Sequence, residues 1–153
     1  MLLATYQAVR DFTLPSEKAR KGGTNNTTAF DTATGRPLWE SPFAGRPVIV
    51  GKTIIMEKTQ LDLLSGEATA TKLARSYGCG ICSASRHLMA FRSATLGYCE
   101  LPQEAGVISY GGVRPGCWIN AIPAGGILLM PDATSQCTCS YENRAWLALQ
   151  PLD

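Results

Sequence analysis

The sequence contains a single histidine, His87, and lacks the motifs of several enzyme classes. It has no Gly-x-Ser-x-Gly, no phosphate-binding loop and no His-Glu-x-x-His. His87 has no second histidine or carboxylate pattern near it in the sequence, and proton transfer is usually assembled from several such groups. We therefore predict no catalytic residue, and no cofactor, from these residues.

Strong charge and long apolar runs are also missing. The net charge is +2, with ten Lys/Arg against seven Asp/Glu in residues 1–78 and four against five in residues 79–153. Neither half has the basic stripe that nucleic-acid binding requires. No apolar run reaches the roughly 20 residues that span a bilayer. Met1–Val9 is too short and not basic enough for a signal peptide, so either the chain stays inside the cell or its true N-terminus is missing.

Helical periodicity is absent as well, whereas 15 Gly and nine Pro are present. Many short strands joined by turns are expected, and 153 residues with 45% hydrophobic content suit one domain. We predict an all-β fold. Residues 1–14 are compatible with a strand or a short helix, and residues 15–28 have the composition of a solvated loop. The expected organisation is an N-terminal segment over 1–23 followed by the β-sheet region over 24–153.

A repeat begins near residue 28. Residues 28–39 predict a strand, an Asp-x-x-x-Gly turn and a second strand, and the turn residues Asp31 and Gly35 recur 31 positions later as Asp62 and Gly66. The Asp side chain can accept backbone N–H bonds across the bend, and Gly supplies the positive φ.

Hairpin signals fill the rest of the chain. Residues 46–56 are two β-branched runs joined at Gly51-Lys52, and residues 83–92 and 95–101 are strand-like. Residues 118–122 and 127–130 flank a Pro-Ala-Gly-Gly turn, and 146–151 closes the series. Four-strand units repeating every 30 to 50 residues or so are typical of a β-propeller.

The run Phe-Asp-Thr-Ala-Thr-Gly-Arg-Pro-Leu-Trp at residues 30–39 resembles the repeat of the pyrroloquinoline-quinone-like (quinoprotein alcohol-dehydrogenase-like) propellers. Residues 114–131, with Cys137-Thr-Cys139 and the run at 147–151, are similar to the C-terminal blades of large bacterial members of planctomycete type. The second repeat has no tryptophan after Gly66, and the third has no Asp-Gly turn. The resemblance covers residues 24–151 and implies blades of four antiparallel strands.

This resemblance implies that the repeat tryptophan, Trp39, docks between neighbouring blades. We expect Trp118 and Trp146 to be packing residues too, since tryptophan is mostly buried. The resemblance also implies an exported protein, periplasmic or extracellular, in which structural disulfides are the leading interpretation of the six cysteines.

Two other interpretations of the cysteines stay open. Cys79, Cys82, Cys137 and Cys139 supply four thiolates for zinc, although Cys-x-Cys is a poorer half-site than Cys-x-x-Cys. A redox pair at Cys79 and Cys82 would need a helix N-terminus to lower the thiol pKa. Direct linkage of Cys137 to Cys139 would strain the backbone, so each is expected to pair with a distant cysteine. By the family resemblance, the favoured partners are Cys82 and Cys117.

The quinoprotein dehydrogenases hold their quinone on the axis of a closed ring, beside adjacent cysteines and calcium. This chain has no Cys-Cys pair, and at about 40 residues per blade it makes only three to four blades. We predict a non-catalytic β-propeller binding or scaffold module of an exported bacterial protein, the C-terminal part of a longer propeller, with a protein or carbohydrate ligand. The alternative is a fragment of a quinoprotein (PQQ-dependent) dehydrogenase-like enzyme. An open arc leaves apolar faces of its terminal blades uncovered, to be covered by missing blades or by self-association. We expect Ile127, Leu128 and Leu129 to be among the apolar residues of such a face.

Overall fold

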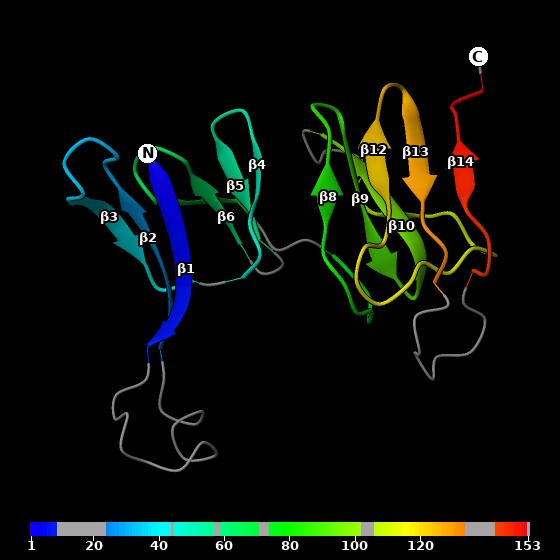
Figure 1. The fold of residues 1–153 in the computed structure, drawn as a ribbon, viewed down its shortest axis with the longest axis horizontal. Helices are drawn as coiled ribbons and strands as arrows, with labels where there is room; N and C mark the ends of the chain where they lie inside the picture. The colour runs from blue at the N-terminus through cyan, green and yellow to red at the C-terminus, as the bar shows by residue number, and fades with distance from the viewer. Residues whose placement is uncertain are drawn as a thin grey trace, which may run out of the picture. The chain divides into compact units, whose positions relative to one another are not determined.

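The computed structural model describes residues 1–8, 24–43, 45–56, 59–70, 74–101, 106–133 and 143–152. In these ranges the chain is all-β, as predicted, with no helix and therefore none that could cross a membrane. Two compact units, Met1–Lys72 and Leu73–Asp153, are described separately. In each unit, strands that follow one another along the chain pair antiparallel with their neighbours, so every sheet is a meander (Figure 1).

The first unit contains two sheets. One has three strands, β1 (Leu2–Ala8), β2 (Thr24–Phe30) and β3 (Pro37–Ser41), in the order β1-β2-β3. The other has four, β4 (Val48–Val50), β5 (Thr53–Ile55), β6 (Gln60–Asp62) and β7 (Ala68–Ala70), in the order β4-β5-β6-β7. The predicted Gly51-Lys52 hairpin is confirmed, since Val50 pairs with Thr53.

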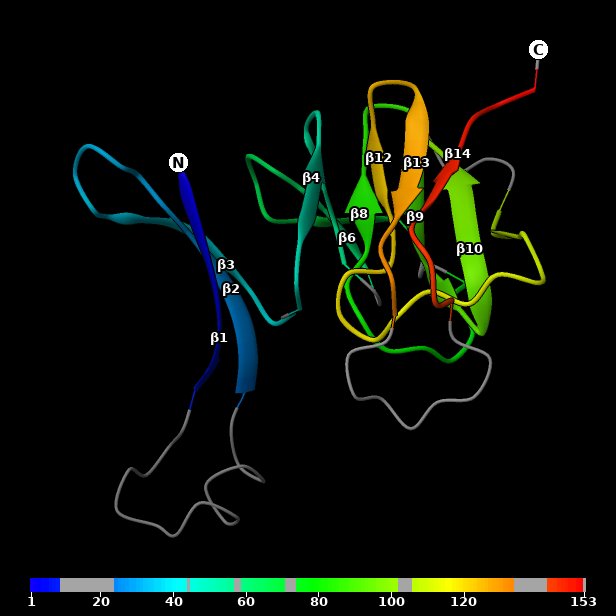
Figure 2. The same cartoon turned by 45° about the vertical axis from the view of Figure 1, so that its right-hand side comes forward.

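The second unit also contains two sheets, which are stacked on one another and overlap in Figures 1 and 2. The sheet of order β11-β10-β9-β8 comprises β8 (Ser83–Ala84), β9 (Leu88–Ser93), β10 (Thr95–Glu100) and β11 (Ile108–Ser109). The sheet of order β12-β13-β14 comprises β12 (Ile122–Ala124), β13 (Ile127–Met130) and β14 (Leu147–Leu149). Both sheets present apolar side chains to a shared core of Ala90, Leu96, Ala121, Leu128 and Met130.

Polar contacts fix the register between the two sheets of the second unit. Asn120 is fully buried; its Oδ1 accepts a bond from the Arg92 backbone N–H at 3.0 Å, and its Nδ2 donates to the Gly116 carbonyl at 2.6 Å. The Ser83 hydroxyl donates to the Ala121 carbonyl. The Asn120–Arg92 and Ser83–Ala121 bonds join the β8–β11 sheet to the segment that leads into β12, so the two sheets are held by polar contacts as well as by apolar packing.

The structure corrects three expectations about the elements. Residues 24–28 belong to strand β2 and not to a loop, and β1 pairs with β2 along its whole length, so the first sheet begins before residue 24. Strand β12 starts at Ile122, which places Pro123 inside a strand where a turn was expected. Proline is tolerated there because β12 is an edge strand. Leu128 is buried in the core, unlike its neighbours Ile127 and Leu129, because successive strand residues point to opposite faces.

Candidate functional site

The two Asp turns of the repeat have the same geometry. Asp31 Oδ1 accepts bonds from the N–H groups of Ala33 and Thr34, at 3.0 and 2.7 Å. Asp62 Oδ1 likewise accepts bonds from the two residues at the same positions in its turn, at 2.9 and 2.8 Å. These bonds to the charged form lower the pKa of both carboxyls below the ordinary 3.8, the largest cause being the N–H three residues on. Gly35 and Gly66 close the turns with φ of +69° and +73°.

The strands around these turns share one register. Phe30 pairs with Pro37 and Ala29 with Trp39; 31 residues later, Leu61 pairs with Ala68 and Gln60 with Ala70. An irregularity falls at the same place in both, between Ala29 and Phe30 and between Gln60 and Leu61. On the preceding strands, Leu2 pairs with Phe30 as Ile54 pairs with Leu61. The residues next to the turn of the first sheet therefore have structural equivalents in the second.

Trp39 joins the two sheets of the first unit. A Cβ built on Gly66 would lie 2.5 Å from Cδ2 of the indole, so the ring occupies the space that a side chain at position 66 would need. The indole Nε1–H donates to the Leu63 carbonyl at 3.2 Å. Trp39 and Leu3 pack on the buried cluster of Ile54, Met56 and Leu61. One face of the β1–β3 sheet thus covers one face of the β4–β7 sheet, with the indole seated on a turn glycine.

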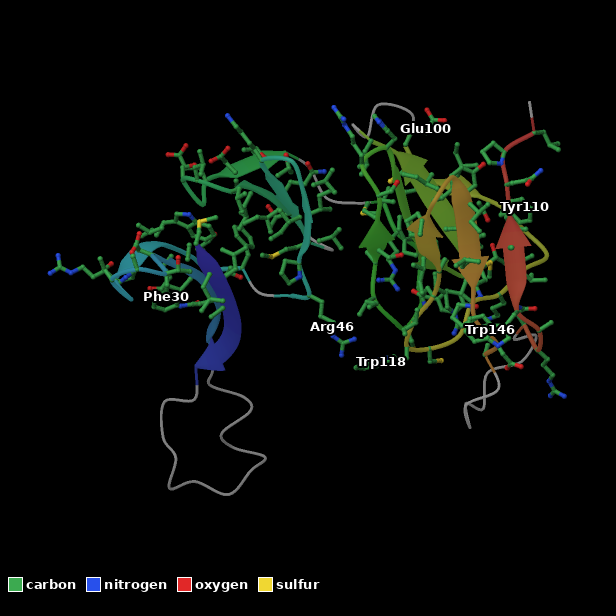
Figure 3. The ribbon with its side chains drawn as sticks, turned by 45° about the horizontal axis from the view of Figure 1, so that its top comes forward. Phe30, Arg46, Glu100, Tyr110, Trp118 and Trp146 are labelled. Atoms are coloured by element: carbon green, nitrogen blue, oxygen red, sulfur yellow. The ribbon has the colours of Figure 1, made fainter. Side chains whose placement is uncertain are left out.

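The opposite face of the β1–β3 sheet is the equivalent of the face that receives Trp39, and it is open. Leu2 corresponds to Ile54, yet Leu2 is 58% exposed and Ile54 is 0% exposed. Gly35 corresponds to Gly66, but a Cβ built on Gly35 would meet nothing within 4 Å. Phe30, labelled in Figure 3, corresponds to the fully buried Leu61 and is only half-buried.

A second open face lies on the β12–β14 sheet. The cross-strand row of Ile122, Leu129 and Ala148 points away from the shared core, because the alternate residues Leu128 and Met130 point into it. Ile122 is 38% exposed, Ala148 is exposed and Leu129 is half-buried. The outward face also carries Ala124 and Ile127 and no charged residue of the three strands. It is an apolar sheet face open to solvent.

The Gly78–Cys82 stretch is organised by Arg75. The Arg75 guanidinium donates to the carbonyls of Gly78 and Cys79, both at 3.0 Å, and to the Arg92 carbonyl at 2.7 Å. Its carbon also lies 5.9 Å from the centre of the Phe91 ring. Cys79 and Cys82 therefore lie in a segment that the hydrogen bonds of Arg75 connect to strand β9. The sequence did not indicate this role for Arg75.

The cysteine predictions remain predictions. Cys137 and Cys139 lie outside the described residues, and no disulfide joins any two of Cys79, Cys82, Cys99 and Cys117. Arg92 Nη1 donates to the Cys117 sulfur at 3.3 Å. Within the described ranges no group of three His, Cys, Asp or Glu side chains is arranged to hold a metal. Peptide mapping without reduction tests whether Cys137 and Cys139 pair with Cys82 and Cys117.

The expectation that Trp118 and Trp146 are packing residues is wrong. They are 62% and 72% exposed, and Figure 3 labels both. Trp118 precedes the Ile81–Ile119 bridge, where its carbonyl accepts the Ile81 N–H at 3.2 Å, so its backbone carries the local contact. His87 is exposed in the β8–β9 connection, where its carbonyl accepts a bond from the Leu101 N–H at 2.8 Å.

No protein-family model, curated protein or solved structure matches this chain.

Proposed function

We propose that this chain is a non-catalytic binding or scaffold module built of β-propeller-type sheets, related to the pyrroloquinoline-quinone-like repeat and exported. Meander sheets that stack face to face, with the same register in successive repeats, support the architecture. The seating of Trp39 on Gly66 supports the kinship, since that contact is what the resemblance implies for the repeat tryptophan.

The outward face of the β12–β14 sheet carries the proposal. A row of Ile122, Leu129 and Ala148 without a charged neighbour costs solvation free energy while it is exposed, and contiguous apolar patches mark contact surfaces. The face offers no side-chain hydrogen-bond donor or acceptor on its three strands, whereas a sugar requires such groups. A protein surface is therefore the ligand class that fits.

A fluorescent apolar probe, 1-anilinonaphthalene-8-sulfonate, tests the face directly. We expect the native protein to bind the probe and the Ile122→Lys variant to lose most of that binding. Ile108→Lys is the matched control, because Ile108 is also 38% exposed but lies on β11. Equal binding by all three proteins would show that the outward face is not a contact surface and would overturn the proposal.

The non-catalytic part of the proposal has its own test. Reconstitution with pyrroloquinoline quinone and calcium, followed by a dye-reduction assay with alcohols, is expected to give no saturable activity. Activity that saturates with substrate and depends on both additions would favour the quinoprotein alternative.

A further inference from the structure

The first unit contains an interface in which one sheet face covers another. Each of the two open faces resembles one side of that interface. Inside that unit, the Leu3–Ala29–Trp39 face of the β1–β3 sheet covers the face of the β4–β7 sheet that holds Ile54 and Leu61. The open face of the β1–β3 sheet is the equivalent of the covered one, with Leu2, Phe30 and Gly35 in the places of Ile54, Leu61 and Gly66. It is therefore shaped to receive the covering face of a sheet of the same kind.

The outward face of the β12–β14 sheet matches two of the three residues of that covering face, because Leu129 and Ala148 stand where Leu3 and Ala29 do, and none of its three strands carries a counterpart of Trp39. Ala148 precedes Leu149-Gln150 as Ala29 precedes Phe30-Asp31, and each alanine lies in a strand flanked by a leucine on its partner, Leu129 or Leu3. Ala29 is fully buried under its sheet partner, while Ala148 is exposed. Among the described residues of its own unit, no further sheet covers either open face.

Resting on the proposed function, we propose that the protein ligand of the β12–β14 face is a second copy of this chain, docked through its open β1–β3 face. The copies associate head to tail: Ile122, Leu129 and Ala148 of one lie on Leu2 and Phe30 of the next. Such a heterologous contact uses different patches on the two copies, so it continues into rings or chains and does not stop at a symmetric dimer.

Both faces favour this occupant over a charged or polar partner. The cross-strand rows that would meet, Leu2–Phe30 on one face and Ile122–Leu129–Ala148 on the other, contain no ionisable side chain. The open space over Gly35 leaves room for the close approach of another sheet. Glu40 lies in the neighbouring row of the same face, paired with Thr28, and its carboxylate accepts a hydrogen bond from the side chain of Asn26, which is one row further from Phe30.

Sedimentation velocity over a range of concentrations tests the proposal with the intact chain and two lysine variants. Leu2→Lys spoils the acceptor face and Ile122→Lys the donor face; each is expected to weaken association by on the order of 100-fold and to sediment as a monomer. Mixed together, the two variants still present one intact face each, so they are expected to form a 1:1 complex that grows no further. Leu64→Lys and Ile108→Lys are matched controls, at 65% and 38% exposure on other surfaces, and should associate as wild type does.

Each other result decides against the head-to-tail contact. If Leu2→Lys still associates while Ile122→Lys does not, the β12–β14 faces pair with one another. If wild type stays monomeric but its probe binding still depends on Ile122, the proposed contact surface stands and the second copy is not its ligand. Circular dichroism of every variant confirms folding, and Ala148→Lys, at another exposed position of the donor row, provides a second disruption of the same face.

Discussion

A pair of glycine substitutions isolates the contribution of the Trp39 contact to stability. Gly35 and Gly66 occupy the same position in two equivalent turns, with φ of +69° and +73°. A Cβ at Gly35 meets nothing within 4 Å, whereas a Cβ at Gly66 would lie 2.5 Å from the Trp39 ring. Alanine at either site has the same backbone strain, so any difference in the free energy of unfolding reports the indole.

The expected magnitudes follow from two separate costs. A left-handed conformation costs a residue with a Cβ about 1–2 kcal/mol, which both Gly35→Ala and Gly66→Ala incur. Only Gly66→Ala must also displace the indole from a packed site, which adds about 1–3 kcal/mol. The second variant should therefore be less stable than the first by about 1–3 kcal/mol. This extra loss should vanish when Trp39 is replaced by Ala, as a double-mutant cycle would show.

Urea unfolding followed by tryptophan fluorescence measures the difference in the unit that carries the change. The chain has three tryptophans, and the exposed Trp118 and Trp146 can be replaced by Phe so that Trp39 alone reports. Variants that contain Trp39→Ala are followed by circular dichroism. Equal destabilisation by Gly35→Ala and Gly66→Ala, or strict additivity with Trp39→Ala, would refute the seating of the indole on the glycine.

Three further predictions concern the turns, the buried amide and the thiols. The lowered pKa values of Asp31 and Asp62 mean that their contribution to stability is present above about pH 4 and is lost as the pH falls through the folded-state values. Thermal unfolding between pH 2 and 7 should therefore show a smaller acid loss in a variant with Asn at both positions, and an unchanged acid loss would contradict this. Asn120→Ala removes two buried hydrogen bonds and should destabilise by about 2–4 kcal/mol in urea unfolding; a loss below 1 kcal/mol or so would mean that water replaces the amide. Under native conditions iodoacetamide should label the exposed Cys79 and leave the buried Cys99 unlabelled until urea is added, and early labelling of Cys99 would show that the β9–β10 hairpin opens.

Local chemistry was sufficient to predict the turns. Asp-x-x-x-Gly and Gly51-Lys52 specify bends through side-chain acceptors and positive φ, which depend on residues within the turn itself. The first strand could not be assigned in the same way. Its partner, Thr24–Phe30, begins Thr-Asn-Asn-Thr-Thr, a composition typical of loops, and the pairing joins segments far apart in the sequence. Such pairing is set by long-range packing, which strand propensity does not report.

The face of the sheet to which a side chain points, and its exposure, were harder to predict than the positions of the strands. The run Ile127-Leu128-Leu129 is apolar throughout, so its sequence does not show that only Leu128 points into the shared core. The face is decided by the register with β12 and β14, in which Ile122 and Ala148 flank Leu129. Trp118 and Trp146 were misassigned for a related reason, because the general preference of tryptophan for burial says nothing about which positions the sheets cover.

The second repeat keeps the pairing of the first while it exchanges the residues on one face. Ala29 and Trp39 are cross-strand neighbours in the first sheet, and their equivalents Gln60 and Ala70 reverse the order of small and large. Sheets stack about 10 Å apart, so a face needs a long side chain to reach a turn glycine on the next sheet. Trp39 supplies that reach, whereas the sequence has an alanine at the equivalent position 70, although the preceding Asp62 turn is fully formed. The turn is therefore conserved within the chain because it closes a hairpin, and the indole is a separate feature that adds the contact between sheets.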